Sequence, residues 1–214
     1  MNTICYDLET GGLDKFNHTI TEAFFAVFDE NWVQLDSLHL YLKNDAGEVK
    51  GEEQAFKITG IDPDELLANP DTVTYTEGRE QLLTMLAKHK LPKKQKHFQL
   101  LGQNIAAFDG PFMEIQGFLT QEHKKTAGIH HNVLDTTVYT TWLKKLGILP
   151  DDVGNLGSLV KYFGLQGREA HRAEDDVYMQ KDVYIAMSDM VKKMALNNLN
   201  SVGSSSDLLK IVEL

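Results

Sequence analysis

Residues 4–13 read ICYDLETGGL, an apolar run that ends in two acidic residues and two glycines. Successive side chains of a β-strand point to opposite faces, so a strand here places Asp7 and Glu9 side by side on one face. Two carboxylates this close repel each other unless one is protonated or a cation lies between them. Their hard oxygen atoms suit Mg²⁺ or Mn²⁺, although two solvated acids at a strand end are the simpler interpretation of this motif alone.

The size and composition of the chain are those of one ordinary globular domain. It has 214 residues, of which 42% are hydrophobic and 24% are charged. No apolar run reaches the length of a membrane span, and the N-terminus does not resemble a signal peptide. The single cysteine, Cys5, excludes an internal disulfide. We therefore expect a cytoplasmic protein with no membrane association.

The net charge of −10 argues against a protein that coats long stretches of nucleic acid, because such binding depends on many contacts from Lys and Arg to phosphate. The negative charge does not exclude an enzyme that binds one end of a nucleic-acid strand. Basic residues cluster at 88–96, at 124–125 and at 144–145. Each cluster is either a solvated face or a contact to a ligand, and the sequence leaves both interpretations open.

Strands are predicted from β-branched and aromatic runs, and helices from apolar residues at helical spacing. The strand that carries Asp7 is followed by strands at 20–28, 32–42, 97–102 and 133–134. The predicted helices are 52–58, 76–89, 106–119, 136–146, 156–163 and 172–195, with an irregular connection at 66–73. This order indicates an α/β fold, in which a mixed sheet carries helices on its faces.

The composition divides the chain into three parts. Residues 1–196 form the predicted domain, and 197–206 are rich in Asn, Ser and Gly, as in a flexible linker. Residues 207–214 form a short apolar tail that docks either on the domain itself or on a partner.

A third acid, Asp109, follows Phe108 shortly after the predicted strand at 97–102. It precedes Gly110 and Pro111, and Asp is a favoured residue at the start of a helix. Helix capping and a chemical role are both open for Asp109 from the sequence.

The segment 170–176, AHRAEDD, leads into the last predicted helix. At about 100° per residue, Asp176 falls on the apolar stripe that continues through Gln180 and Val183, whereas Asp175 lies about 100° away. A carboxylate on a buried stripe must be paired, protonated or bound to a metal. His171 is expected on the loop before the helix, where it is a candidate base.

Taken in order, Asp7-x-Glu9, Phe108-Asp109 and His171-x-Ala173-x-x-Asp176 resemble the three motifs of the DEDDh 3′–5′ exonucleases. This superfamily includes polymerase proofreading subunits, RNase T and oligoribonuclease. The segments ITGI at 58–61 and LDT at 134–136 also resemble family motifs, and the resemblance covers about residues 1–195. One departure is Asn104, which three residues separate from Phe108, more than in the family pattern.

The resemblance implies a ribonuclease H-like fold, which is a mixed five-stranded sheet flanked by helices, with the acids gathered at one edge of the sheet. It implies two divalent ions per site, Mg²⁺ or Mn²⁺, and hydrolysis that releases nucleoside 5′-monophosphates from a 3′ end. The implied metal ligands are Asp7, Glu9, Asp109 and Asp176, and the implied base is His171.

The implied substrates are single-stranded 3′ ends of DNA or RNA, with DNA favoured. An RNA-trimming exoribonuclease is the first alternative, because the choice of sugar depends on contacts to the 2′ position. An inactive subunit that binds 3′ ends is the second. A polymerase, a sliding clamp or another protein is a possible partner for the tail at 207–214.

Overall fold

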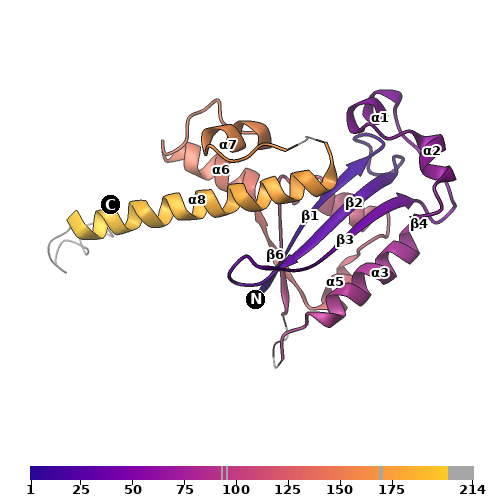
Figure 1. Ribbon diagram of the computed structural model, residues 1–214, viewed down its shortest axis with the longest axis horizontal. Helices are drawn as coiled ribbons and strands as arrows, with labels where there is room; N and C mark the ends of the chain where they lie inside the picture. Colours follow the sequence, from indigo (N-terminus) through magenta and orange to yellow (C-terminus); the bar gives the residue numbers. More distant parts are fainter. Residues whose placement is uncertain (93, 95, 169–170, 202–214) are drawn as a thin grey trace.

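The computed structural model describes residues 1–201 except residues 93, 95, 169 and 170. Its strands are β1 (Asn2–Thr10), β2 (Ile20–Phe28), β3 (Gln34–Lys43), β4 (Thr72–Thr74), β5 (Phe98–Gly102) and β6 (Ile129–Asp135). They form one sheet in the order β4-β3-β2-β1-β5-β6 (Figure 1). β2 pairs antiparallel with β1 and β3, and the other neighbours pair in parallel, so the predicted mixed sheet is confirmed.

The sheet has six strands rather than the five that the resemblance implied, and β4 is the additional one. β4 lies where the sequence predicted an irregular connection, and it pairs in parallel with the end of β3 through Tyr41 and Thr72. A three-residue strand is too short for its alternation to be seen in the sequence. Its conformation depends on the edge of β3, which the sequence pattern does not reveal.

The described helices include the six that were predicted and two more. Their bounds are α1 (Glu53–Thr59), α2 (Pro63–Ala68), α3 (Tyr75–Lys88), α4 (Asp109–Ile115), α5 (Gln121–Ala127), α6 (Thr136–Lys145), α7 (Leu156–Tyr162) and α8 (Ala173–Ser201). The additional helices are α2 and α5. Pro63 occupies the first position of α2, and the side chain of Asp62 accepts from the N–H groups of Asp64 and Glu65. Pro63 therefore starts a helix here.

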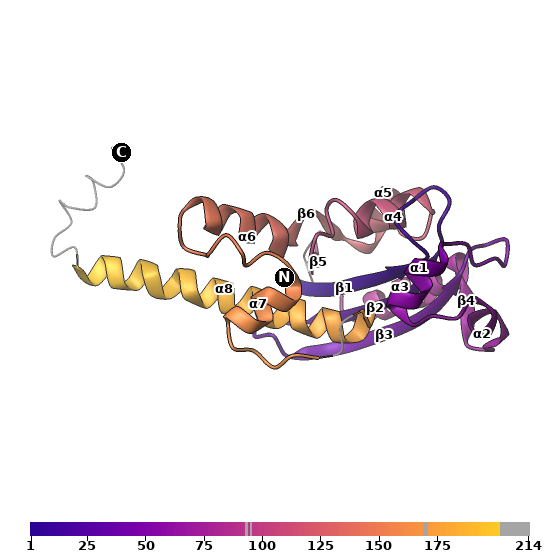
Figure 2. The ribbon, with the colours of Figure 1, turned by 90° about the horizontal axis from the view of Figure 1, so that it is seen from above.

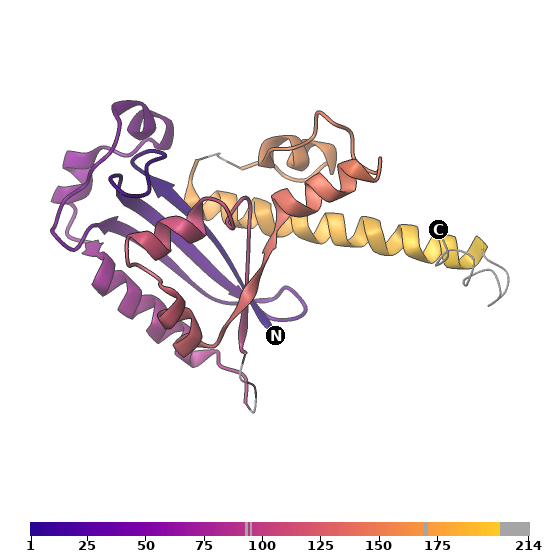
Figure 3. The same cartoon turned by 180° about the vertical axis from the view of Figure 1, so that it is seen from behind.

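Helices cover both faces of the sheet. Ile4, Tyr6 and Leu8 of β1 belong to the core cluster that includes residues of α3, α4 and α5, whereas Cys5 packs with Ala173 of α8. Figure 2 shows α8 on one side of the sheet and α4 and α5 on the other, and Figure 3 shows α3, α4 and α5 in front of the strands. The acids of β1 therefore share the face that α8 covers.

α8 is the longest described helix and extends beyond the sheet (Figure 1). There it forms a second core with α6 and α7 through residues such as Leu143, Leu159 and Val183. The helix was expected to end at residue 195, but it continues to Ser201 and includes the first residues of the expected linker. Residues 202–206 and the expected tail at 207–214 lie outside the described residues. Within the described part, no helix combines the length and the hydropathy needed to cross a membrane.

Candidate active site

The two acids of β1 lie under α8. Asp7 is half-buried and Glu9 is 7% exposed. The side-chain nitrogen Nε2 of Gln180 on α8 donates to Oδ1 of Asp7 at 2.6 Å. This contact fixes the Asp7 carboxylate against the helix and leaves its second oxygen free of Gln180.

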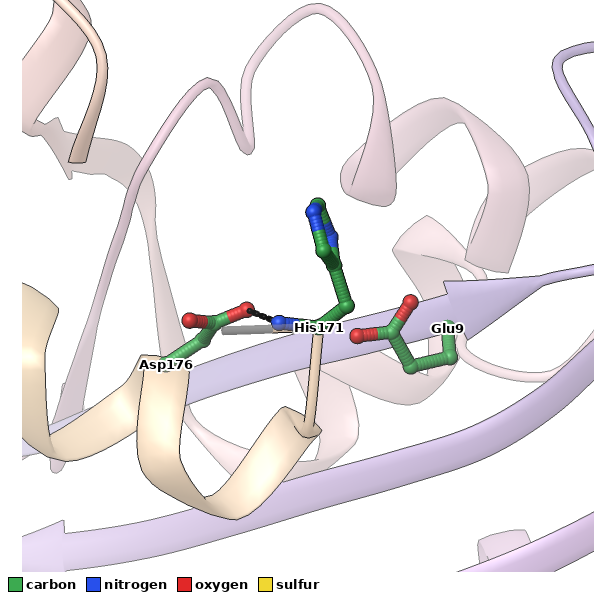
Figure 4. A group of neighbouring side chains, drawn as sticks. All are labelled: Glu9, His171 and Asp176. Atoms are coloured by element: carbon green, nitrogen blue, oxygen red, sulfur yellow. Dashed lines mark hydrogen bonds between the residues drawn. The ribbon is translucent and has the colours of Figure 1, made fainter. Parts of the chain in front are cut away.

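Asp176 and His171 face Glu9 across the start of α8. One candidate ligand atom from each of these three side chains lies within 4.8 Å of the others, and the two carboxylates flank His171 in Figure 4. The backbone N–H of His171 donates to Oδ2 of Asp176 at 3.2 Å. The turn before α8 and the first turn of the helix thus bring a carboxylate and an imidazole to the end of β1.

His171 has φ of 63°, which lies in the left-handed region. Non-glycine residues rarely adopt this conformation, and such residues gather at functional sites. The hydrogen bond to Asp176 holds the turn, while the side chain of His171 stays exposed. The imidazole is therefore presented to solvent beside the acids rather than packed into the core.

The phase of α8 separates its three consecutive acids. Asp176 is half-buried and faces Glu9, whereas Asp175 forms an ion pair with Arg168 at 3.3 Å. Glu174 is exposed, and its carboxylate lies 3.9 Å from the ring of His39. Of these three acids, Asp176 is the one that the structure brings to the acids of β1.

Asp109 is the first residue of α4 and is 4% exposed. Its Oδ1 accepts from the backbone N–H of Leu8 at 3.2 Å, which joins α4 to β1 between Asp7 and Glu9. The N-cap of α4 is Phe108, whose side chain makes no capping hydrogen bond, and Asp109 lies one position inside the helix. The capping role that the sequence left open for Asp109 is therefore wrong.

Three further polar residues, Asp135, Gln180 and Glu22, support the site, and no role was assigned to them from the sequence. Asp135 at the end of β6 is 4% exposed and accepts from the N–H groups of Asn104 and Ala106 at 2.9 and 3.0 Å. It therefore holds the loop that leads to Asp109. The LDT segment was the available signal for Asp135, and the helical stripe shared with Asp176 was the signal for Gln180.

Glu22 is the third such residue. It pairs with Glu9 across β1 and β2 and is 2% exposed, and its Oε1 lies 2.7 Å from Nε2 of His39. No local pattern marks Glu22, because its position depends on the register between two strands. The pair places one more carboxylate beside the cluster.

Burial and mutual repulsion raise the pKa values of the acids. The pKa of Asp7 is raised well above its usual value by burial and then by Asp109, Asp176 and Glu9. Burial is also the largest cause that raises the pKa of Glu9 to about 8, of Asp109 to about 7 and of Asp176 to about 6. The cluster therefore holds more negative charge than its surroundings compensate, and protons or cations stabilise it.

This donor set fits divalent metal ions. Glu9 and Asp176 bring carboxylate oxygens close to a ring nitrogen of His171, and Asp109 bonds to the backbone of β1 between Asp7 and Glu9. Hard oxygen donors are the ligands that Mg²⁺ and Mn²⁺ prefer. Burial and then neighbouring acids raise the pKa of Asp7, and a bound cation would compensate the repulsion among these acids.

The chain is similar to known exonucleases in sequence pattern and in fold. A family model described as RNase_T, Exonuclease, matches residues 4–184. No curated protein matches the chain. Among solved structures, E. coli exonuclease I in complex with a dT13 oligonucleotide is 17% identical, with a TM-score of 0.66 over 92% of this chain and 43% of that chain.

Two other solved structures are similar to this chain to about the same degree. The zinc-bound form of an E. coli ExoI–ssDNA complex is 20% identical, with a TM-score of 0.67 over 98% of this chain and 44% of that chain. Exonuclease I from Methylocaldum szegediense is also 20% identical, with a TM-score of 0.67 over 90% and 40% of the two chains. This chain thus spans less than half the length of these proteins. The likeness confirms the predicted fold class.

Proposed function

This chain belongs to the RNase T family of exonucleases, and we propose that its acidic cluster hydrolyses phosphodiester bonds at the 3′ ends of nucleic acid. The convergence of acids from three separate segments carries the proposal. β1 supplies Asp7 and Glu9, the start of α4 supplies Asp109, and α8 supplies Asp176. His171 lies beside them in the turn before α8.

In this proposal Asp7, Glu9 and Asp176 would hold a first Mg²⁺ or Mn²⁺, and Asp7 and Asp109 would help to hold a second. When bound, two such ions stabilise the attacking and leaving oxygens of an in-line displacement at phosphorus. Gln180 orients the Asp7 carboxylate, and the N–H of His171 orients that of Asp176. These contacts let the acids keep a fixed arrangement before substrate arrives.

The proposed base is a ring nitrogen of His171, which takes a proton from the attacking water. The water oxygen then bonds to phosphorus, and the bond from phosphorus to the 3′ oxygen of the preceding nucleotide breaks. That 3′ oxygen takes up a proton and becomes the new 3′ end, while a nucleoside 5′-monophosphate is released. The exposed side chain of His171 supports this role, because the group must reach solvent water and substrate.

For the substrate we propose single-stranded DNA, with RNA as the alternative. The support is the likeness in fold to exonucleases that were solved with a dT13 oligonucleotide and with ssDNA. We further propose a cytoplasmic location, because the single Cys5 leaves no disulfide to form within the chain. A protein partner for residues 207–214 stays a proposal as well.

The test is incubation of the pure protein with matched, 5′-labelled DNA and RNA oligomers in Mg²⁺, in Mn²⁺ and in excess EDTA. We expect ladders of shortened oligomers and free mononucleotide with either ion, faster on DNA. A stable shifted band without cleavage indicates the inactive end-binding alternative, and a strong preference for RNA indicates the exoribonuclease. Full turnover in EDTA contradicts the metal requirement.

A further inference from the structure

A cavity of about 690 Å³ lies on the face of the sheet opposite α8. It is open to solvent on one side and is lined by residues of α4, α5 and the strands β5 and β6. Tyr6 lines it, and this side chain points to the other face of β1 from Asp7. The cavity is therefore separate from the face on which the β1 acids meet α8. Its apolar lining includes Leu100, Ile105, Ile115, Ile129 and Val133.

Cationic and imidazole side chains surround this apolar surface. Lys96 comes from the basic cluster at 88–96, whereas Lys124 and Lys125 form the cluster at 124–125 of α5. His130 and His131 of β6 also line the cavity, with ring centroids 4.5 Å apart. Two basic clusters that are distant in sequence thus meet at one cavity, in a chain with a net charge of −10. This local excess of positive charge suits an anionic ligand.

Two partly buried side chains at the cavity, Lys124 and Glu114, have unused capacity for hydrogen bonds. The side chain of Lys124 is 13% exposed, and its Nζ lies 3.8 Å from Oε2 of Glu114, which is too long for a hydrogen bond. Oε1 of Glu114 accepts from the N–H of Gln121 at 3.1 Å. Oε2 is buried and has no hydrogen-bond partner among the described residues. The two side chains form an ion pair at this distance, but the pair leaves the buried Oε2 atom without a hydrogen bond, so both groups are suited to a ligand that supplies one.

We propose that this cavity binds a nucleoside phosphate. The phosphate lies against Lys124, Lys125 and Lys96, and the sugar and base cover the apolar surface. An N–H group of the base donates to Oε2 of Glu114. Cavities of roughly 300–1,000 Å³ with a few placed polar groups are the usual size for ligands of this class.

The combination of groups selects this ligand over simpler anions. Inorganic phosphate would meet the lysines but would leave the apolar surface uncovered, and the Glu114 carboxylate would repel it. A nucleoside without phosphate would give Lys124 no anionic group besides Glu114. A nucleoside phosphate supplies an anion, an apolar ring and an N–H donor in one molecule. It can be a free mononucleotide or one residue of a strand.

This inference does not require the acidic cluster to be catalytic. If the proposed function holds, the released nucleoside 5′-monophosphate belongs to the same chemical class. The two ideas fail separately, because the cavity is tested without metal and without turnover.

The experiment is calorimetric titration of dAMP into the full chain in EDTA, with deoxyadenosine and inorganic phosphate as comparisons. We expect the wild-type protein to bind dAMP at least about tenfold more tightly than either fragment. Lys124→Gln and Glu114→Gln should each weaken the binding of dAMP at least about tenfold. Lys192→Gln is the matched control, because this side chain lies on α8 and is 71% exposed. It should leave binding unchanged.

A further set of variants separates the cavity from the acidic cluster. Asp7→Asn should leave the binding of dAMP in EDTA unchanged. If Lys124→Gln has a lower melting temperature than the wild type, Lys125→Gln provides the same test of dAMP binding at the second lysine of α5. A short DNA oligomer that binds more tightly than dAMP, and is weakened by Lys125→Gln, identifies a strand as the source of the nucleotide.

Three results overturn the proposal. The first is absence of dAMP binding to the wild-type protein. The second is binding that Asp7→Asn abolishes while the folded lysine variants retain it, since the nucleotide then occupies the acidic cluster. The third is an affinity for inorganic phosphate as high as that for dAMP, since the base then contributes nothing to binding.

Discussion

Asp175 and Asp176 are neighbours in the sequence with different surroundings in the structure. Asp176 faces Glu9 and accepts from the N–H of His171, whereas Asp175 pairs with Arg168 at the surface. We expect Asp176→Asn to lower kcat at saturating Mg²⁺ by at least roughly 10²-fold, as the loss of one group that holds charge at the site. Asp175→Asn should stay within about fivefold of the wild type, because exposed ion pairs contribute little.

Both variants are assayed side by side on one oligomer. The reverse pattern, with activity lost in the Asp175 variant and kept in the Asp176 variant, would contradict the assignment of the site. Circular dichroism of both proteins shows whether the helix is intact.

A substitution at His171 tests the proposed proton transfer, again at the scale of a single residue. Replacing it with Ala should lower kcat by roughly 10²- to 10⁴-fold, which is the usual contribution of a positioned base. The carboxylates stay in place, so the midpoint for Mg²⁺ in a thermal-shift titration should change little. A variant with normal turnover removes His171 from the mechanism, and a variant that no longer binds Mg²⁺ makes it a metal ligand instead.

At the scale of elements, the end of β5 approaches both β1 and α8 at Gly102. A Cβ atom there would lie 2.4 Å from Cγ2 of Ile105 and 3.0 Å from Oε1 of Gln180. We expect Gly102→Ala to destabilise the fold by about 1–3 kcal/mol, since the loop before Asp109 or the Gln180 side chain must move. Activity should fall as well, because Gln180 orients Asp7.

The matched control is Gly157→Ala in α7, where the nearest atom to an added Cβ lies 3.7 Å away. This change replaces Gly with a better helix former and should raise stability by up to about 1 kcal/mol. Urea unfolding measures both variants. Equal stability of the two would show that β5 does not pack as closely as the structure has it.

At the scale of the whole molecule, the raised pKa values make the stability of the metal-free protein depend on pH. Burial and neighbouring acids raise the pKa of Glu9 to about 8, above the value of about 4.3 for an exposed Glu. Between these values the folded state binds more protons than the unfolded chain, so stability falls as pH rises. The melting temperature in EDTA should therefore fall from pH 5 to pH 8, and Mg²⁺ should offset the loss at pH 8.

The variant Glu9→Gln isolates this contribution. It cannot ionise, so its advantage over the wild type in EDTA should grow as pH rises from about 4 to 8. Scanning calorimetry at several pH values measures the difference. An advantage that shrinks with pH would contradict the raised pKa of Glu9.

The last prediction concerns residues 207–214, which lie outside the described residues. The acids and His171 of the proposed site all lie between residues 7 and 176, and this segment supplies none of them. Deleting 207–214 should leave cleavage of a free oligomer nearly unchanged. Loss of both activity and cooperative melting in the truncated protein would make the segment part of the fold.

The sequence by itself determined the periodic features of this protein. Strand alternation separates Asp7 and Glu9 from Tyr6 and Leu8, and the structure has the same division between the two faces of β1. Helix phase separates Asp176 from Asp175. These features follow from the fixed geometry of one strand or one helix, so a short run of consecutive residues encodes them. The ordered motifs likewise indicated the family before any fold was known.

Only the tertiary structure decided what depends on contacts between distant segments. β4 exists because β3 offers an edge to pair with, and Glu22 meets Glu9 through the register of β1 and β2. The lysines at 96 and 124 reach one cavity because α5 packs beside the strands. Local periodicity holds no information on register or on which segments meet. Long-range pairing and packing decide these, and they emerge only when the whole chain has folded.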